Sequence, residues 1–321
     1  MDRTMPSRMN RRQRAPLLAA LLGTLVALGL PSSGRAEPND PARRYAGRAR
    51  VYEHLSPESL EAVTTPARIK AVTAGNVAPM EIWRALEHGE KVECLDCIPH
   101  VAKLLYSSHP KTREISAWWL RRRIFGVFGP GEVYSQVVQT LSSDPSAERR
   151  AQAAEALGEF LVRPGVTHVA TALRQDASPL VREASARALE RLNSEGPAGE
   201  LGAAIARDGE DERVVLSALK AATRINVFTG MDAVVSQIDH PSARVRKRAA
   251  EVVGALRARD AVVGLVAITS AETEPDAGVR AAAVAALGQI GDPSTRAAVE
   301  AALDDANGFV RDAAAIALRR L

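Results

Sequence analysis

The sequence has 321 residues, of which 46% are apolar and 25% are charged, as is usual for a folded protein. Its two cysteines exclude a disulfide-dense scaffold and any metal site that needs four cysteine ligands. Aromatic residues make up only 4%, so we expect a core of Ala, Leu and Val, a mixture that favours helices over sheets. The formal net charge of +4 at first suggests a protein that binds nucleic acid.

Residues 1–36 have the parts of a secretory signal peptide. The basic stretch Arg8–Arg14 precedes an apolar run, Ala15–Leu30, and Gly34 and Ala36 put small residues at positions −3 and −1 of a cleavage site. The apolar run is short for a membrane span, which needs about 20 residues, and an uncleaved anchor is the alternative. We therefore expect export to the periplasm or outside the cell, cleavage near Ala36, and no membrane span in the mature chain.

The predicted signal also explains the basic net charge. It holds six arginines and one aspartate, which leaves 36 of the 42 basic and 37 of the 38 acidic side chains in the remainder. The mature chain is nearly neutral, so a nucleic-acid partner is not expected.

Residues 98–321 repeat one helical pattern about every 33 residues. An anchor position, usually arginine, is followed by small or apolar residues at +4, +7 and +10, which lie on one stripe of a helix. Turn residues such as Asp176 and Pro179 precede the anchors, and a shorter apolar segment precedes each turn, so each unit is predicted to be helix–turn–helix. One such pair cannot bury its own stripe, so neighbouring pairs must stack. The anchors are Arg113, Arg150, Arg182, Val215, Arg246, Arg280 and Arg311.

The turns Asp176–Arg182 and Asp305–Arg311 follow the pattern Asp-x-x-Pro-x-Val-Arg, with Gly308 in place of Pro in the second. With its Ala-rich second helices, the chain resembles HEAT repeats of the short bacterial type, similar to those of phycobilin lyase-type proteins. The resemblance implies an all-α, right-handed α-solenoid of about seven units with an N-terminal helical cap. It also implies a structural ladder in which turn aspartates and arginines bond between neighbouring repeats, interrupted near Val215. The ladder residues are Asp176, Arg182, Arg246, Arg280, Asp305 and Arg311.

These observations divide the chain into three predicted parts. Residues 1–36 are the predicted signal peptide, residues 37–97 a linker and N-terminal helical cap, and residues 98–321 the solenoid. Within the cap, Pro79–His88 is predicted to form a helix closed by Gly89.

Both cysteines lie in Cys94-Leu95-Asp96-Cys97, just before the first repeat. A local disulfide that pins the cap to the first repeat suits an exported protein and is the interpretation we favour. A redox-active pair is an alternative, because a helix N-terminus lowers the pKa of a thiol. A metal site that includes His88 and His100, or two inert thiols, are the remaining interpretations.

The segment 118–134 contains five of the twelve aromatic residues. It is interpreted either as a hydrophobic joint between the cap and the first repeats or as a patch that binds a partner, because aromatic residues and arginine are favoured in binding hot spots. The three consecutive arginines could also bind a phosphate, an acidic peptide or a carboxylated glycan. The candidates for partner binding are Trp118, Trp119, Arg121, Arg122, Arg123, Phe125 and Phe128.

Known catalytic motifs are missing from the sequence. It has no His-Glu dipeptide of the kind that holds iron in deoxyhypusine hydroxylase-like proteins, no phosphate-binding loop, no nucleophile elbow and no His-Glu-x-x-His helix. We therefore expect no metal and no cofactor. The predicted function is an exported, non-enzymatic scaffold that binds a protein or peptide through the concave face of its second helices or through segment 118–134. The alternative is a redox or chromophore-related enzyme, a HEAT-type lyase or oxidoreductase, that uses Cys94 and Cys97.

Overall fold

The computed structural model describes residue 56 and residues 65–123, 131–193, 198–225 and 227–321, all within the unit His54–Leu321. Every regular element in this described part is a helix, and none of these helices is long and apolar enough to cross a membrane. The predicted signal peptide, most of the linker, and Phe125 and Phe128 lie outside the described residues.

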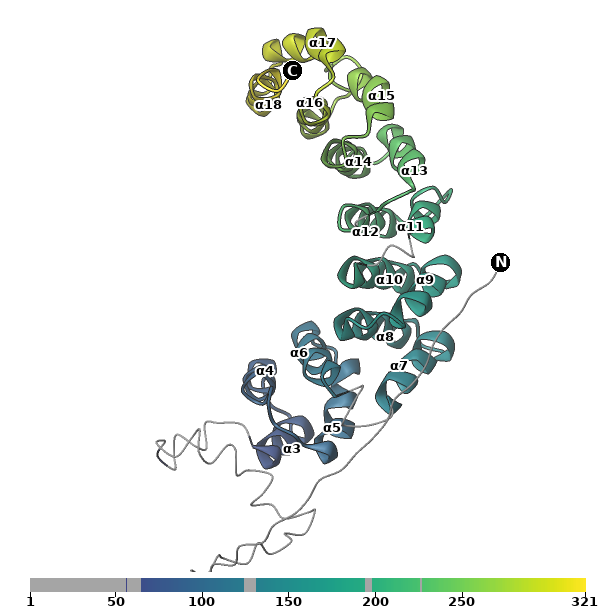
Figure 1. Cartoon of the computed structure of the whole chain (residues 1–321), viewed down its shortest axis with the longest axis vertical. Coiled ribbons are helices and arrows are strands. Elements are labelled where there is room, and N and C mark those ends of the chain that lie inside the picture. Colours follow the sequence, from purple (N-terminus) through teal and green to yellow (C-terminus); the bar gives the residue numbers. More distant parts are fainter. Residues whose placement is uncertain (1–55, 57–64, 124–130, 194–197, 226) are drawn as a thin grey trace, which may run out of the picture. The chain divides into compact units, whose positions relative to one another are not determined.

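The helices form pairs whose members alternate between two layers (Figure 1). The first layer contains α3 (Pro66–Ala74), α5 (Ile98–Lys103), α7 (Glu132–Ser143), α9 (Gly165–Gln175), α11 (Ala198–Ile205), α13 (Met231–Val235), α15 (Val262–Ala267) and α17 (Arg296–Ala301). The second contains α4 (Pro79–His88), α6 (Pro110–Arg121), α8 (Ala147–Phe160), α10 (Pro179–Leu192), α12 (Glu212–Ala222), α14 (Ala243–Ala255), α16 (Ala277–Ile290) and α18 (Gly308–Leu318). This arrangement confirms the predicted all-α solenoid of helix–turn–helix pairs.

Short polar residues and prolines start the second helices where the sequence predicted. The side chains of Ser146, Asp276 and Asn307 accept hydrogen bonds from backbone N–H groups of the first turn of α8, α16 and α18. Proline occupies the first turn of α4, α6 and α10. The helix predicted over Pro79–His88 is α4, and Gly89 follows its last residue.

The core runs along the second helices, which stack on one another. The residues seven positions after the first six anchors are fully buried, as expected for an apolar stripe, and Leu318, after the last anchor, is half-buried. Glycine allows unusually close packing between some of these helices: a Cβ on Gly158 would lie 2.8 Å from the Cα of Ala188, and one on Gly288 would lie 2.6 Å from the Cα of Ala317. The buried +7 residues include Leu157, Leu189, Ala222, Val253 and Leu287.

Candidate functional site

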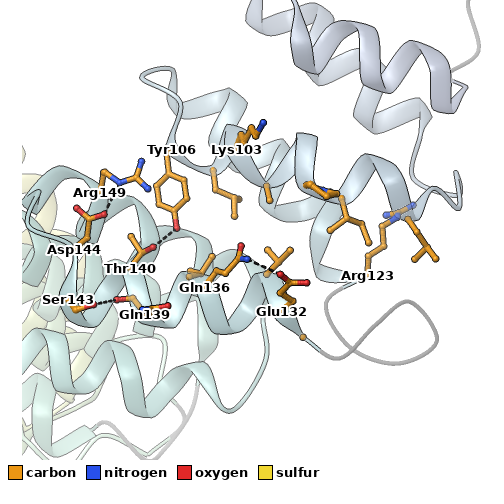
Figure 2. Close-up of a pocket in the computed structure, with 18 residues that line it drawn as sticks. Lys103, Tyr106, Arg123, Glu132, Gln136, Gln139, Thr140, Ser143, Asp144 and Arg149 are labelled. Carbon is orange, nitrogen blue, oxygen red and sulfur yellow. Dashed lines mark hydrogen bonds and ion pairs between the residues drawn. The ribbon is translucent and has the colours of Figure 1, made fainter.

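An open groove of about 900 Å³ lies between α5, with the short helix η2 (Leu104–Tyr106) that extends it, and α7 (Figure 2). The apolar side chains of Ile98, Pro99 and Ala102 line its α5 side. The helices α5 and α7 contact each other less than α7 and α9 do. The connection over residues 122–131 is the longest between a second helix and the next first helix, and it accounts for the 37-residue step between the anchors Arg113 and Arg150. The sparse contact between α5 and α7 leaves room for this groove.

Polar side chains with fixed partners form the rim of the groove (Figure 2). The hydroxyl of Tyr106 donates to Oγ1 of Thr140 over 3.1 Å, and the guanidinium of Arg149 lies 4.2 Å from the centre of the Tyr106 ring. Burial raises the pKa of Tyr106, so its hydroxyl stays protonated at neutral pH. Hydrogen bonds from Arg149 and from the N–H of Ser146 lower the pKa of Asp144, which remains a carboxylate. The rim thus presents ordered donors and acceptors.

A row of polar side chains on α7 also lines the groove. Gln136, Gln139, Thr140 and Ser143 recur at helical spacing and so share one side of α7. Gln136 donates to Glu132 over 3.1 Å, which holds one amide of the row in place. Neither the groove nor this row was expected from the sequence; the 37-residue repeat step was the one signal that pointed to it.

Cys94 precedes the short helix η1 (Leu95–Cys97) at one end of the groove, and Cys97 is the last residue of that helix. Their sulfur atoms lie 2.11 Å apart and their Cα atoms 5.3 Å apart. Both cysteines are buried, and Sγ of Cys97 lies 3.7 Å from the carbonyl oxygen of Pro66 at the start of α3. Leu95 between them is 58% exposed and lines the groove. The pair therefore connects the start of α3 to the wall of the groove.

The metal site considered for the cysteines has no counterpart in the described part of the chain. Within residues 56, 65–123, 131–193, 198–225 and 227–321, no three His, Cys, Asp or Glu side chains gather in a way that could hold a metal ion.

Two residues of the predicted partner patch are inside the core, so the prediction is wrong for them. Trp119 is fully buried, and its Nε1 donates to the carbonyl of Gly89 over 2.9 Å. Arg123 lies 3.6 Å from the centre of the Trp119 ring and donates to the carbonyls of Glu90 and Val92 over 2.6 and 2.8 Å. Arg123 thus binds the carbonyls of the chain that follows α4. Trp119 is fully buried, and Arg123, although it lines the groove, is only 6% exposed, so neither is a surface residue of the predicted patch.

The other arginines of that segment do not form one cationic cluster. Arg122 pairs with Glu90 over 2.6 Å. Arg121 lies 5.8 Å from the ring of Trp118, which is half-buried against the core. The segment therefore joins α4 to α6 through Trp119 and Arg123, and among its candidates the described surface residues are Trp118, Arg121 and Arg122.

The face of the second helices, which the sequence predicted to be the binding face, has smaller hollows, one among α6, α8 and α10 and one of about 480 Å³ among α14, α16 and α18. About 230 Å³ opens among α6, α8 and α10, where Glu159 pairs with Arg191 over 2.5 Å and Glu155 pairs with Arg113 over 2.9 Å. Burial raises the pKa of Glu159, and the charge of Arg191 opposes this shift. Most charges in this hollow already have partners, so the groove between α5 and α7 is the better candidate site.

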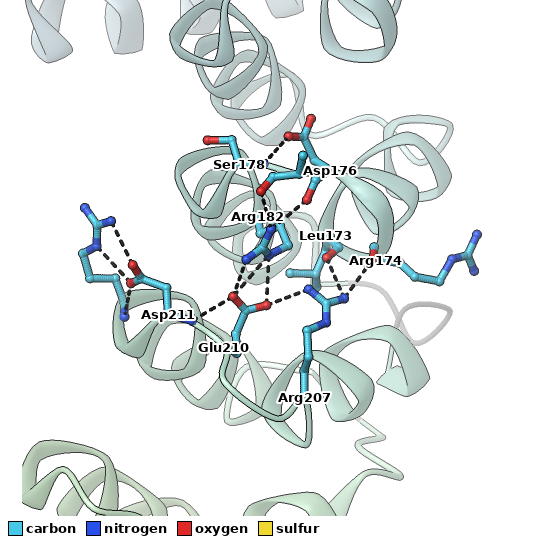
Figure 3. A network of polar contacts seen from close by, with 10 residues as sticks. Leu173, Arg174, Asp176, Ser178, Arg182, Arg207, Glu210 and Asp211 are labelled. Atoms are coloured by element: carbon cyan, nitrogen blue, oxygen red, sulfur yellow. Dashed lines mark hydrogen bonds and ion pairs between the residues drawn. The ribbon is translucent and has the colours of Figure 1, made fainter.

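The turn residues join neighbouring repeats through arginine clamps (Figure 3). Nη1 of Arg182 donates to the carbonyls of Asp176 and Ala177 in its own turn, over 2.7 and 3.0 Å. Nε and Nη2 of Arg182 donate to the carboxylate of Glu210 in the next turn, over 2.9 and 2.6 Å. Arg207 donates to the same carboxylate over 2.6 Å.

Three more clamps have the same form. Their Nε-to-carboxylate distances are 2.7 Å for Arg150–Asp176, 2.6 Å for Arg246–Glu274 and 2.8 Å for Arg280–Asp305. The sequence pattern, which has aspartate at this position, does not include Glu210 and Glu274, whose longer side chains reach the same arginine position. Arg311 donates through Nη1 to the carbonyls of Asp305 and Ala306.

The clamp carboxylates are charged at neutral pH. Burial disfavours the charged form of Asp176, Glu210 and Glu274, but hydrogen bonds from the arginines and from a backbone N–H outweigh it and lower the pKa of each carboxyl. For Asp305, the hydrogen bond from Arg280 is the largest influence and lowers its pKa. Each clamp is therefore a largely buried ion pair.

Comparison with known proteins agrees with this geometry. Residues 231–319 match the HEAT-repeat family. The chain contains HEAT repeats. No curated protein sequence matches this HEAT-repeat protein.

Two solved structures share the fold of the HEAT-repeat chain. Kap95p, in a complex with RanGDP, is similar with a TM-score of 0.62 and 15% identity over 88% of this chain and 43% of Kap95p. YibA of E. coli is similar with a TM-score of 0.53 and 16% identity over 86% of this chain and 97% of YibA. The phycocyanin lyase proteins CpcE and CpcF of Nostoc sp. give a TM-score of 0.39, with 23% identity over 70% of this chain and 86% of theirs. The similarities to Kap95p and YibA show a shared fold alone.

Proposed function

We propose that this HEAT-repeat protein is an exported, non-enzymatic scaffold that binds a protein or peptide segment in the groove between α5 and α7. The observation that carries the proposal is the groove itself, about 900 Å³ of open space with an apolar α5 wall facing a polar row on α7. The fold is compatible with this role, since its structural neighbour Kap95p binds RanGDP.

An extended peptide fits the chemistry of the two walls. The amides of Gln136 and Gln139 and the hydroxyl of Ser143 can both donate and accept hydrogen bonds, as the backbone of an extended peptide requires. Alternate side chains of such a peptide point to opposite sides, so one set can pack on Ile98 and Ala102 while the backbone faces α7.

The proposed location outside the cytoplasm rests on the signal-like residues 1–36 and on the cysteine pair. Disulfides persist in oxidising compartments, and Cys94 and Cys97 lie next to each other as a disulfide requires. The nearly neutral mature chain favours a protein or peptide over a nucleic acid as the partner.

The alternative enzyme would use Cys94 and Cys97 for redox or chromophore chemistry. Catalytic thiols act as accessible thiolates, whereas Cys97 is fully buried and Cys94 is nearly so. This burial favours the structural role. Thiol titration of the intact protein with and without a mild reductant distinguishes the two, because a readily exchanged pair would support the enzyme.

The groove is tested by selecting displayed peptides on the full chain and measuring their affinity for two matched double variants. Q136R/Q139R places two cations on the exposed groove side of α7, and T167R/T171R places two on exposed positions of α9. We expect selected peptides to lose at least about tenfold in affinity for the α7 variant, about 1.4 kcal/mol, and to keep their affinity for the α9 variant. Equal binding to both variants, or no selectable peptide, would contradict the proposal.

A further inference from the structure

Four of the five joints between successive second helices from α8 to α18 have an arginine clamp. In each, one arginine binds two carbonyls of its own turn and a carboxylate of the next turn. The clamps lie at α8–α10, α10–α12, α14–α16 and α16–α18. In the last of these, the side chains of Arg280 and Asp305 are 7% and 5% exposed. A largely buried bidentate pair fixes both distance and orientation between neighbouring turns.

The joint between α12 and α14 has neither half of the clamp. Val215 occupies the arginine position and is buried. His240 occupies the carboxylate position, where its Nδ1 accepts the N–H of Ser242 over 3.0 Å. The carboxylates of Asp176, Glu274 and Asp305 accept the N–H two residues ahead in the same way. His240 thus preserves the local turn but offers no anion to the preceding repeat.

The close glycine contact seen at three of the clamped joints is also missing from this joint, as it is from α10–α12, where Glu190 occupies the glycine position. Gly254 lies eight residues after its anchor, where a Cβ would be 2.7 Å from the Cα of Ala286, and Gly158 and Gly288 make equivalent contacts. At the α12–α14 joint, the residue eight positions after the anchor Val215 is Thr223, which is exposed. The contact between α12 and α14 is smaller than those of the four clamped joints.

The remaining interactions across the joint constrain orientation weakly. Arg244 and Glu212 form an ion pair over 3.0 Å, but their side chains are 75% and 37% exposed, so water and salt screen it. In the first layer, Gly202 of α11 meets Gly230 before α13, and a Cβ on Gly202 would lie 3.2 Å from the Cα of Gly230. Because neither glycine has a side chain, this contact brings the two backbones together but contains no interlocking side chains that would fix their orientation.

We propose that the joint between the α11–α12 pair and the α13–α14 pair is a hinge of this solenoid. The block α7–α12 and the block α13–α18 each move as a stacked unit, and their relative orientation changes at this joint. Because each repeat contacts only its neighbours, loss of the clamp and of the glycine contact at one joint concentrates the motion there. This inference stands whether or not the groove binds a peptide.

Distance distributions between spin labels test the hinge in the full chain under non-reducing conditions. One pair, A203C/V263C, spans α11 to α15 and includes the proposed hinge. The matched pair, D232C/A297C, spans α13 to α17 and includes only clamped joints; all four positions are exposed. We expect the first distribution to be about twofold broader than the second, since only it crosses the weak joint. Equal widths, or a broader control, would overturn the hinge.

A second variant tests the cause of the motion. V215R/H240E restores both halves of the clamp and is combined with the A203C/V263C labels. In a variant that retains the helical circular dichroism of the parent, we expect the distribution to narrow to the width of the control pair. An unchanged width in the folded variant would overturn the missing clamp as the cause. Should this variant fail to fold, the comparison of the two label pairs still decides the hinge.

Discussion

The α14–α16 joint and the α12–α14 joint are adjacent parts of one repeat array, yet they are held together differently. The first has the Arg246–Glu274 clamp and the Gly254–Ala286 contact. The second has Val215, His240 and Thr223 at the corresponding positions and a solvent-exposed ion pair. The comparison teaches that buried polar residues set the coupling between repeats, while the apolar stripe, present in both joints, sets the fold.

Removal of a clamp arginine should have the largest effect. R280M leaves the buried carboxylate of Asp305 without its partner, which should cost about 3–5 kcal/mol in the opening free energy of α16–α18 measured by native-state hydrogen exchange. The matched change V215M places the same side chain at the equivalent unclamped position and should cost at most about 1–3 kcal/mol. Similar losses in the two variants would remove the distinction between the joints.

A methyl group at a close helix contact should have the next largest effect. In G288A the new Cβ would lie 2.6 Å from Ala317, so α16 and α18 must separate, at about 1–3 kcal/mol. T223A, at the equivalent exposed position directly after α12, should change the unfolding free energy by less than about 0.5 kcal/mol. Chemical denaturation of both variants makes the comparison, and a neutral G288A would show that the glycine contact does not hold the joint.

Acid should weaken the clamped joints before the unclamped one. The pKa values of Asp176, Glu210, Glu274 and Asp305 are lowered from the ordinary 3.8 for Asp and 4.5 for Glu. When folding lowers the pKa of a carboxyl, its charged form stabilises the folded state. This contribution is complete above the ordinary pKa and is lost as the pH falls through the lowered pKa. The advantage of wild type over R280M in urea unfolding should therefore shrink as pH falls below about 4. An advantage that stays constant from neutral pH to pH 3 would argue against a charged clamp.

The smallest effect is expected at the exposed ion pair of the unclamped joint. R244A removes its partnership with Glu212, which should change the unfolding free energy by less than about 1 kcal/mol and less still at high salt. A thermal melt at low and high salt measures this. A loss as large as that of R280M would mean that this pair holds the joint despite its exposure.

The helices and their stacking could be predicted from the sequence because both depend on local, periodic signals. Offsets of +4, +7 and +10 define a buried stripe, and turn residues such as Asp176 define helix starts. The interruption at Val215 was likewise readable from a single position. The replacement of Asp by Glu210 and Glu274 was not, because their reach to the arginine depends on the path of the turn.

The predicted patch could not be sorted into surface and core from the sequence alone. Trp118 and Trp119 are neighbours in the chain, but Trp119 is buried and Trp118 is only half-buried. Arg123 is buried because the chain after α4 presents carbonyls to its guanidinium, a contact between residues more than 30 positions apart. The groove is equally non-local, since it depends on how far α5 and α7 stand apart.

Native-state hydrogen exchange of the full chain over a series of low urea concentrations tests the central claim most directly. If one weakly coupled joint divides the array, the protected amides should fall into two cooperative groups, one ending at α12 and the other beginning at α13. A single cooperative group across α8–α18, or a boundary at a clamped joint such as α14–α16, would contradict it.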